Sequence, residues 1–374
     1  MNFALGLLIF LPFLTAIISI HELAHFGVAR HFGMKVTEYF IGFGPKIWST
    51  RKGELEWGVK GLPIGGYVKI AGMNPYEVVA PEDVSRTYGA KPPYQRALTI
   101  FAGPGSHFVV GAILFSLTFF FFGDFRSTVP VVGTVDASMN GSTSPASDAG
   151  IQPGDVIVRV GDVSNPTQER LIDVISTAAR QDAGQPLVIT VERDGQEVRL
   201  EMVPELDIVD GVELGRVGIV LGLERVGVVS SVVAGVKEVG FAIQESVSQV
   251  GRVFGPQGIG RIFTLLTSDE QRAPDDATSV VGISQQVGAT SSTGDWATIL
   301  YFFAFITVFI GLINLVPLPP FDGGHLAVVA YEKVTHHTVD MRKLIPVSAA
   351  VIAFFVIFVG ATVFLDFAKP IPTP

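Results

Sequence analysis

The sequence contains no cysteine and has few charged residues. Without cysteine, disulfides and thiolate metal sites are excluded, so histidine, aspartate and glutamate must supply any metal ligands. Charged residues make up only 16% of the 374 residues, and the mean hydropathy is +0.46. No run of basic residues indicates nucleic-acid binding. This composition is typical of a protein that lies in a lipid bilayer.

Four long stretches lack Asp, Glu, Lys and Arg, and each is long enough to cross the hydrocarbon core as a helix. These stretches are residues 3–20, 97–122, 297–321 and 344–365. We therefore expect transmembrane helices at 1–30, 97–123, 296–330 and 344–366. The first could instead be a secretory signal, but nothing basic precedes it in MNFALG, so we keep it as a span.

Lysine and arginine are concentrated between the first two spans and in the short loop 331–343. The positive-inside rule places both of these segments on the cytoplasmic side. The region 124–296, which holds many of the acidic residues, then lies on the other side of the membrane, as do both termini. The first and third spans consequently both end at the cytoplasmic boundary.

The first span ends in His21, Glu22 and His25, an H-E-x-x-H pattern. On a helix the two histidines lie on one face and can share a zinc ion, and the glutamate between them can act as a general base. The pattern also occurs by chance, and a histidine on an apolar face is usually a hydrogen-bonded core residue. Here the three ionisable groups directly follow an uncharged span and need a strong partner. We therefore expect a metal site.

A catalytic zinc site needs a third protein ligand. Asp322 is the leading candidate because it follows 25 uncharged residues and lies at the same cytoplasmic boundary. The preceding prolines, which include Pro317 and Pro320, should open the helix, as is tolerated where backbone lines protein or a water-filled cavity. His325, one turn further on, is a rival ligand. Alternatively, Asp322 only caps the following helix.

Four segments together resemble the site-2 proteases, which are intramembrane zinc metalloproteases. The resemblance is to the bacterial PDZ-bearing branch that includes the regulator-of-sigma-E protease. The segments are HELAHFGVARHFGMKVTEYFIGFGPKIWS at 21–49, LPIGGYVKIAGM at 62–73, FAGPGSHFVVGAIL at 101–114 and NLVPLPPFDGGHL at 314–326. Four motifs in the same order are far more specific than one metal signature.

The resemblance implies a set of roles for residues of this chain. His21, His25 and Asp322 would be zinc ligands, Glu22 the general base, and Asn314 a residue that holds substrate near the metal. The cytoplasmic-side segment 31–96 would contain a membrane-dipping β-loop.

The family also implies a location and a substrate. The location would be the bacterial cytoplasmic membrane, with the active site near its cytoplasmic side. The substrate would be a transmembrane protein such as an anti-sigma factor, and remnant signal peptides are the alternative. A metal-binding scaffold and a transporter fit less well, because the ionisable residues cluster at one depth.

This chain departs from the family pattern at two positions. Ala24 stands where the family often has glycine, which changes one methyl group on the helix. In the second span, His107 stands where the family's GPxxN motif has asparagine. His107 could donate the same hydrogen bond as a packed residue. If it instead reached the zinc, the site would be less open.

The extracytoplasmic region resembles one PDZ domain at 127–205. A run through Pro153-Gly154-Asp155 leads into a strand with apolar residues at Val156, Val158 and Val160. A helix candidate over 166–179 and a hairpin with Asp194-Gly195 at its tip follow. A generic small β-domain is the alternative. The domain could bind an extended peptide by strand addition or act as a steric filter.

The remaining extracytoplasmic segment, 220–293, is expected to contain amphipathic helices and a loop. Apolar residues at helical spacing over 226–266 predict helices that lie on the outer membrane surface or pack on the PDZ domain. The polar stretch 267–293 predicts a mobile loop. The expected fold is thus an α-helical polytopic membrane protein with a membrane-dipping β-loop and one extracytoplasmic PDZ domain.

Overall fold

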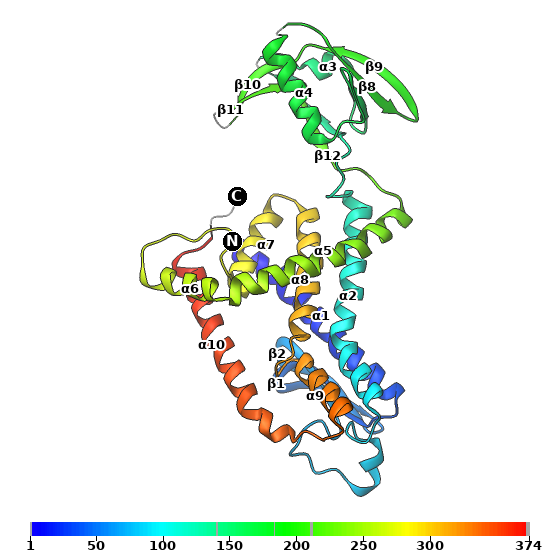
Figure 1. Cartoon of the computed structure of the whole chain (residues 1–374), viewed down its shortest axis with the longest axis vertical. Helices are drawn as coiled ribbons and strands as arrows, with labels where there is room; N and C mark the ends of the chain where they lie inside the picture. Colours follow the sequence, from blue (N-terminus) through cyan, green and yellow to red (C-terminus); the bar gives the residue numbers. More distant parts are fainter. Residues whose placement is uncertain (1, 140, 183, 210–211, 372–374) are drawn as a thin grey trace. The chain divides into compact units, whose positions relative to one another are not determined.

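The uncharged stretches form long helices in the computed structural model, which describes residues 2–139, 141–182, 184–209 and 212–371. Within these ranges four helices are long and apolar enough to cross a membrane, which confirms the predicted number of spans. They lie in α1 (Asn2–His31), α2 (Pro93–Phe122), α8 (Trp296–Asn314) and α10 (Ile345–Ala368) (Figure 1). The chain divides into two compact units, residues 1–116 with 235–374 and residues 117–234.

The first unit contains a bent antiparallel sheet made of β1 (Val36–Lys52) and β2 (Leu55–Ile70). Residues 38–41 pair with 56–59 on one side and with 66–69 on the other, and 46–52 pair with 55–60. The two long strands therefore fold back on each other, with 66–70 at one edge of the sheet. Gly42 permits the bend, since its φ is +84° and an added Cβ would lie 2.6 Å from the Leu62 carbonyl oxygen.

Residues 280–292, which we predicted to be part of a mobile loop over 267–293, form the helix α7 (Val280–Ser292). That prediction is wrong because small residues on both helices let the backbone of α7 pack directly against α1. A Cβ added at Gly6 of α1 would lie 1.7 Å from the Ser284 carbonyl oxygen. Such close contact between helices is typical of small residues in membrane proteins.

The third span is broken, as the prolines predicted. Helix α8 ends at Asn314, and α9 (Asp322–Thr335) begins after the turns at 315–321, so 296–330 is two helices. Helices α5 (Val228–Phe254) and α6 (Pro256–Thr267) occupy the segment predicted to be helical, and apolar residues such as Val229 and Phe263 are exposed on them. Their position on a membrane surface remains a prediction. Short 3-10 helices lie at Pro81–Arg86 and Met341–Leu344.

The second unit contains a sheet with strand order β12-β3-β6-β8-β9, and β7 pairs with β6. The helix α4 (Gln168–Gln181) contributes Leu171 and Ile175 to the core of this unit. The strands are β3 (Val131–Val135), β4 (Ser138–Met139), β5 (Ser142–Thr143), β6 (Val156–Val160), β7 (Val163–Ser164), β8 (Leu187–Arg193), β9 (Gln196–Met202), β10 (Glu205–Val209), β11 (Val212–Arg216) and β12 (Ile219–Gly222), and a short helix α3 spans Pro145–Asp148.

Two details of this unit differ from the sequence prediction. The buried residues of β6 are Ile157 and Val160, because a register irregularity between β6 and β8 interrupts the simple alternation. The sheet also includes β12, which lies beyond residue 205 in the sequence. The helix and the Asp194-Gly195 hairpin are present at α4 and β8–β9.

Candidate metal centre

Three potential metal ligands converge in the first unit. His21 and His25 lie on the last part of α1, and Asp322 is the first residue of α9. The two Nε2 atoms are 3.0 Å apart, and Asp322 Oδ2 lies 3.1 Å from that of His21 and 3.4 Å from that of His25. Among the residues that the structure describes, these three are the group of His, Cys, Asp or Glu side chains whose geometry could hold a metal ion.

The spacing of these ligand atoms fits zinc. Tetrahedral zinc with bonds of about 2.0–2.1 Å separates neighbouring ligand atoms by about 3.3 Å. The three observed separations, 3.0, 3.1 and 3.4 Å, lie close to that value. Both histidines are buried, and two imidazoles with one carboxylate are a common donor set for catalytic zinc. The residues present therefore fit a zinc ion held by three protein atoms.

Helix α2 supports the histidines from one side. The Nδ1–H of His25 donates to the carbonyl oxygen of Thr99 at 2.7 Å, which leaves Nε2 free to bind a metal. Gly103 lies so close that an added Cβ would be 2.2 Å from His25 Nε2 and 2.7 Å from His21 Cε1. Only glycine leaves room for both imidazoles at this position.

Glu22 is held by the sheet. Its Oε2 accepts a hydrogen bond from the backbone N–H of Val68 at 3.0 Å, and its side chain is partly buried. Because Val68 donates to Glu22, the edge of the sheet at 66–70 faces this carboxylate. The general base candidate is thereby fixed between α1 and the sheet.

The other predicted residues occupy different places. Asn314 is the last residue of α8, half-buried, and its side chain makes no hydrogen bond within the described part of the chain. His325 does not belong to the metal-binding group, and neither does His107. Asp322 does not cap α9, since the cap residue is Phe321 and no side chain caps the helix. The carboxylate instead faces the histidines.

Sequence reasoning missed the contributions of Thr99 and Val68, which act through backbone atoms and leave no trace in residue type. Gly103 is part of the motif FAGPGSHFVVGAIL, and the run Gly103-Pro104-Gly105 inside an apolar helix is the signal that could indicate its close approach to the histidines.

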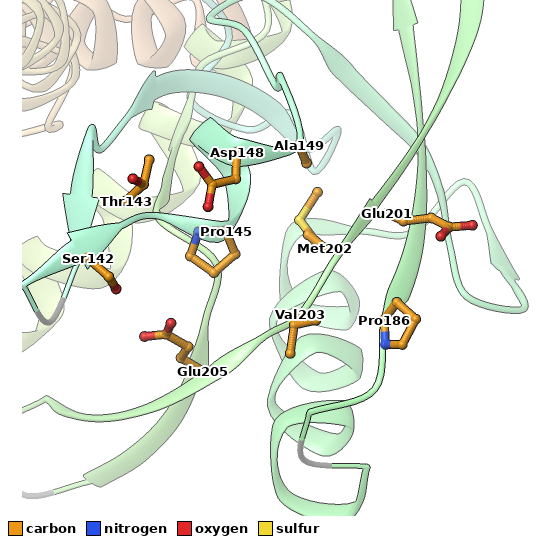
Figure 2. Close-up of a pocket in the computed structure, with 10 residues that line it drawn as sticks. All are labelled: Ser142, Thr143, Pro145, Asp148, Ala149, Pro186, Glu201, Met202, Val203 and Glu205. Carbon is orange, nitrogen blue, oxygen red and sulfur yellow. The ribbon is translucent and has the colours of Figure 1, made fainter.

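The second unit has a hollow of about 500 Å³, but its lining residues do not form a metal-binding group among the described residues (Figure 2). The ten residues that line it include Asp148, Glu201, Glu205 and Met202, and none of them is a histidine. The candidate site is therefore the cluster on α1 and α9.

Comparison with known proteins agrees with the motifs. Residues 9–358 match Peptidase family M50. The chain is 33% identical to the zinc metalloprotease Rip1 of Mycobacterium tuberculosis and 32% identical to Rip1 of Mycolicibacterium smegmatis, in both cases over 99% of each chain. It is 29% identical to the metalloprotease MmpA of Caulobacter vibrioides, over 89% of this chain and 88% of that protein. The chain therefore belongs to peptidase family M50, the site-2 protease family of zinc metalloproteases, and its cofactor is zinc.

Proposed function

We propose that this protein is a zinc metalloendopeptidase that hydrolyses peptide bonds within or near the transmembrane segment of single-pass membrane proteins. The observation that carries the proposal is the convergence of His21, His25 and Asp322 beside Glu22, at the end of a helix long enough to span a membrane. Ionisable groups at membrane depth are energetically costly, so those that occur there usually mark a functional site.

In this proposal His21, His25 and Asp322 hold the zinc ion. Bound zinc supplies Lewis acidity toward the scissile carbonyl and the attacking water. Glu22 takes the proton of that water and passes it to the leaving amide nitrogen. The hydrogen bond from Val68 N–H orients the Glu22 carboxylate for both transfers.

The substrate must be held in an extended form, because a transmembrane helix hides its amide bonds in its own hydrogen bonds. We propose that an extended substrate segment pairs by strand addition with the edge of the sheet on the N-terminal side of Val68. An apolar hollow of about 590 Å³ supports this position, since it lies between residues 11–20 of α1 and the sheet residues Ile41 and Pro63. The free amide of Asn314 would hold the substrate backbone near the zinc.

The topology is part of the same proposal. The basic segments at 30–96 and 331–343 support a cytoplasmic position for the site, with both termini and the second unit outside. The exposed apolar residues Ile47, Trp48 and Leu62 support a sheet that dips into the bilayer. The bacterial cytoplasmic membrane and an anti-sigma factor as substrate rest on the resemblance to the regulator-of-sigma-E branch.

We further propose that the second unit is a PDZ domain that restricts which substrates reach the site. The order of α3, β6, α4 and the β8–β9 hairpin supports this assignment. The hairpin β10–β11 packs against α4, where a Cβ added to Gly215 would lie 2.6 Å from the Ile175 carbonyl oxygen. Because the β10–β11 hairpin covers part of α4, we favour a role as a steric filter over the binding of an extended peptide. Deletion of residues 117–234, the compact unit, should widen the range of substrates that are cleaved.

The test of the proposed function compares wild type with Glu22→Gln. Each is co-expressed with a single-pass membrane reporter, and zinc is measured in both purified proteins. We expect cleavage by wild type, a loss of about 10²–10⁴-fold or more in Glu22→Gln, and zinc in both. Absence of zinc from both proteins would contradict the proposal and would favour a scaffold role.

A further inference from the structure

The two histidines of the metal centre differ in what holds their second ring nitrogen. The Nδ1–H of His25 donates to the Thr99 carbonyl oxygen at 2.7 Å. The Nδ1 of His21 is also buried, but no hydrogen-bond partner for it exists in the described ranges. Histidines that bind a metal almost always donate this second N–H to an oxygen or another acceptor, which fixes the orientation of the ring. His21 therefore lacks, within the described ranges, the second-nitrogen partner that His25 has.

His107 of α2 lies beside the ring of His21. Its ring centre is 5.1 Å from that of His21, and the residue is only 1% exposed. Neither of its ring nitrogens has a hydrogen-bond partner among the described residues. Two adjacent buried rings thus carry nitrogens without a partner, Nδ1 on His21 and both nitrogens on His107, although an unsatisfied buried polar group costs about 1–3 kcal/mol.

The packing holds His107 in place. His107 follows Gly103 by four residues, so both lie on the face of α2 that borders the metal centre. Gly311 of α8 packs closely on His107, since a Cβ added there would lie 2.6 Å from His107 Cβ. The backbone of two helices consequently keeps the His107 ring next to His21.

We propose that His107 is the positioning residue of His21. One ring nitrogen of His107 accepts the hydrogen bond of His21 Nδ1–H, either directly or through a single buried water. When Nε2 of His21 binds zinc, its Nδ1 must carry the proton and act as a donor. A neutral His107 offers the matching acceptor, and the two rings supply polar partners for a bridging water. This role rests on the proposed zinc site and assigns His107 no contact with zinc.

The test is zinc affinity, measured by chelator competition on the detergent-solubilised protein. His107→Leu removes the acceptor, and His107→Asn keeps one in its amide oxygen. We expect the zinc dissociation constant to rise about 10–100-fold in His107→Leu, and most of that loss to be recovered in His107→Asn. His31→Leu, which removes an exposed histidine of α1, is the matched control and should bind zinc as wild type does.

Two further readouts separate positioning from general damage. The zinc-free proteins should unfold at similar temperatures, and the visible absorption of the cobalt-loaded protein should change in His107→Leu but not in His31→Leu. Wild-type zinc affinity in His107→Leu would overturn the inference, as would equal losses in His107→Leu and His107→Asn. If His25→Ala binds zinc as tightly as wild type, the proposed zinc site itself is wrong.

Discussion

The helices α1 and α10 are both apolar enough to span a membrane, and both carry ionisable residues near their C-terminal ends. On α1 the polar atoms of His21 and His25 face Asp322 and leave ligand atoms for a metal. On α10 the carboxylate of Asp366 is fully occupied by protein groups. An ionisable residue within an apolar helix therefore indicates a strong partner, and only the surrounding atoms decide whether that partner is a metal.

The partners of Asp366 form a closed set. Arg272 donates to Oδ1 at 2.7 Å, and both side chains are at most 1% exposed. The backbone N–H groups of Ser279 and Gly282, at the start of α7, donate to Oδ2 at 2.9 and 3.0 Å. Every oxygen of this carboxylate is therefore satisfied, and the site fastens α10 to α7.

The largest expected effect on stability comes from breaking this ion pair. Arg272→Met would leave Asp366 buried without its counter-charge, which should cost about 3–5 kcal/mol of unfolding free energy. SDS titration of the micelle-bound protein measures this loss. Arg252→Met, which removes an exposed pair with Glu245, is the matched control and should cost about 0–1 kcal/mol. Similar losses in the two variants would contradict the structural role of Asp366.

The next largest effect is expected from a substitution at the metal centre, on reporter cleavage and zinc binding. Gly103→Ala places a methyl group where His25 Nε2 now lies 2.2 Å from the ideal Cβ position, so the imidazoles must move. A shift of about 1 Å should lower reporter cleavage by about 10²-fold and weaken zinc binding. Gly27→Ala on α1, where an added Cβ meets nothing within 4 Å, should keep both properties. Full activity in Gly103→Ala would show that the site is looser than the contacts indicate.

The smallest effect is expected on the exposed face of α10. Ile357 is 73% exposed, so Ile357→Ala should change the unfolding free energy by no more than about 0.5 kcal/mol. Leu365, on the same helix, is 1% exposed, and Leu365→Ala should cost about 2–5 kcal/mol. The same SDS titration measures both. A large loss in Ile357→Ala would mean that this face of α10 packs against another protein surface.

The sequence predicted what depends on local pattern. The lengths of the uncharged stretches predicted the spans, and the spacing of His21 and His25 placed them on one face of α1. Asp322, about 300 residues away in the chain, is predicted because it follows 25 uncharged residues. The expected direction of the first and third spans, which hydropathy and basic residues supply, supports the same choice.

The sequence could not predict contacts that form only when the backbones of distant segments pack closely together. Helix α7 was missed because its small polar residues are typical of loops until a neighbouring helix packs on them. Arg272 and Asp366 are separated by 94 residues, and nothing in either neighbourhood indicates the other. The hydrogen bond from Val68 to Glu22 involves a backbone N–H, so no residue type reveals it.

The most direct test of the metal centre is the zinc content of wild type, Asp322→Ala and Asp366→Ala, each purified in detergent and measured on its folded fraction. We expect about one zinc per chain in wild type, loss of most of it in Asp322→Ala, and retention in the folded fraction of Asp366→Ala. Retention of zinc in Asp322→Ala together with its loss in Asp366→Ala would contradict the assignment of the metal centre.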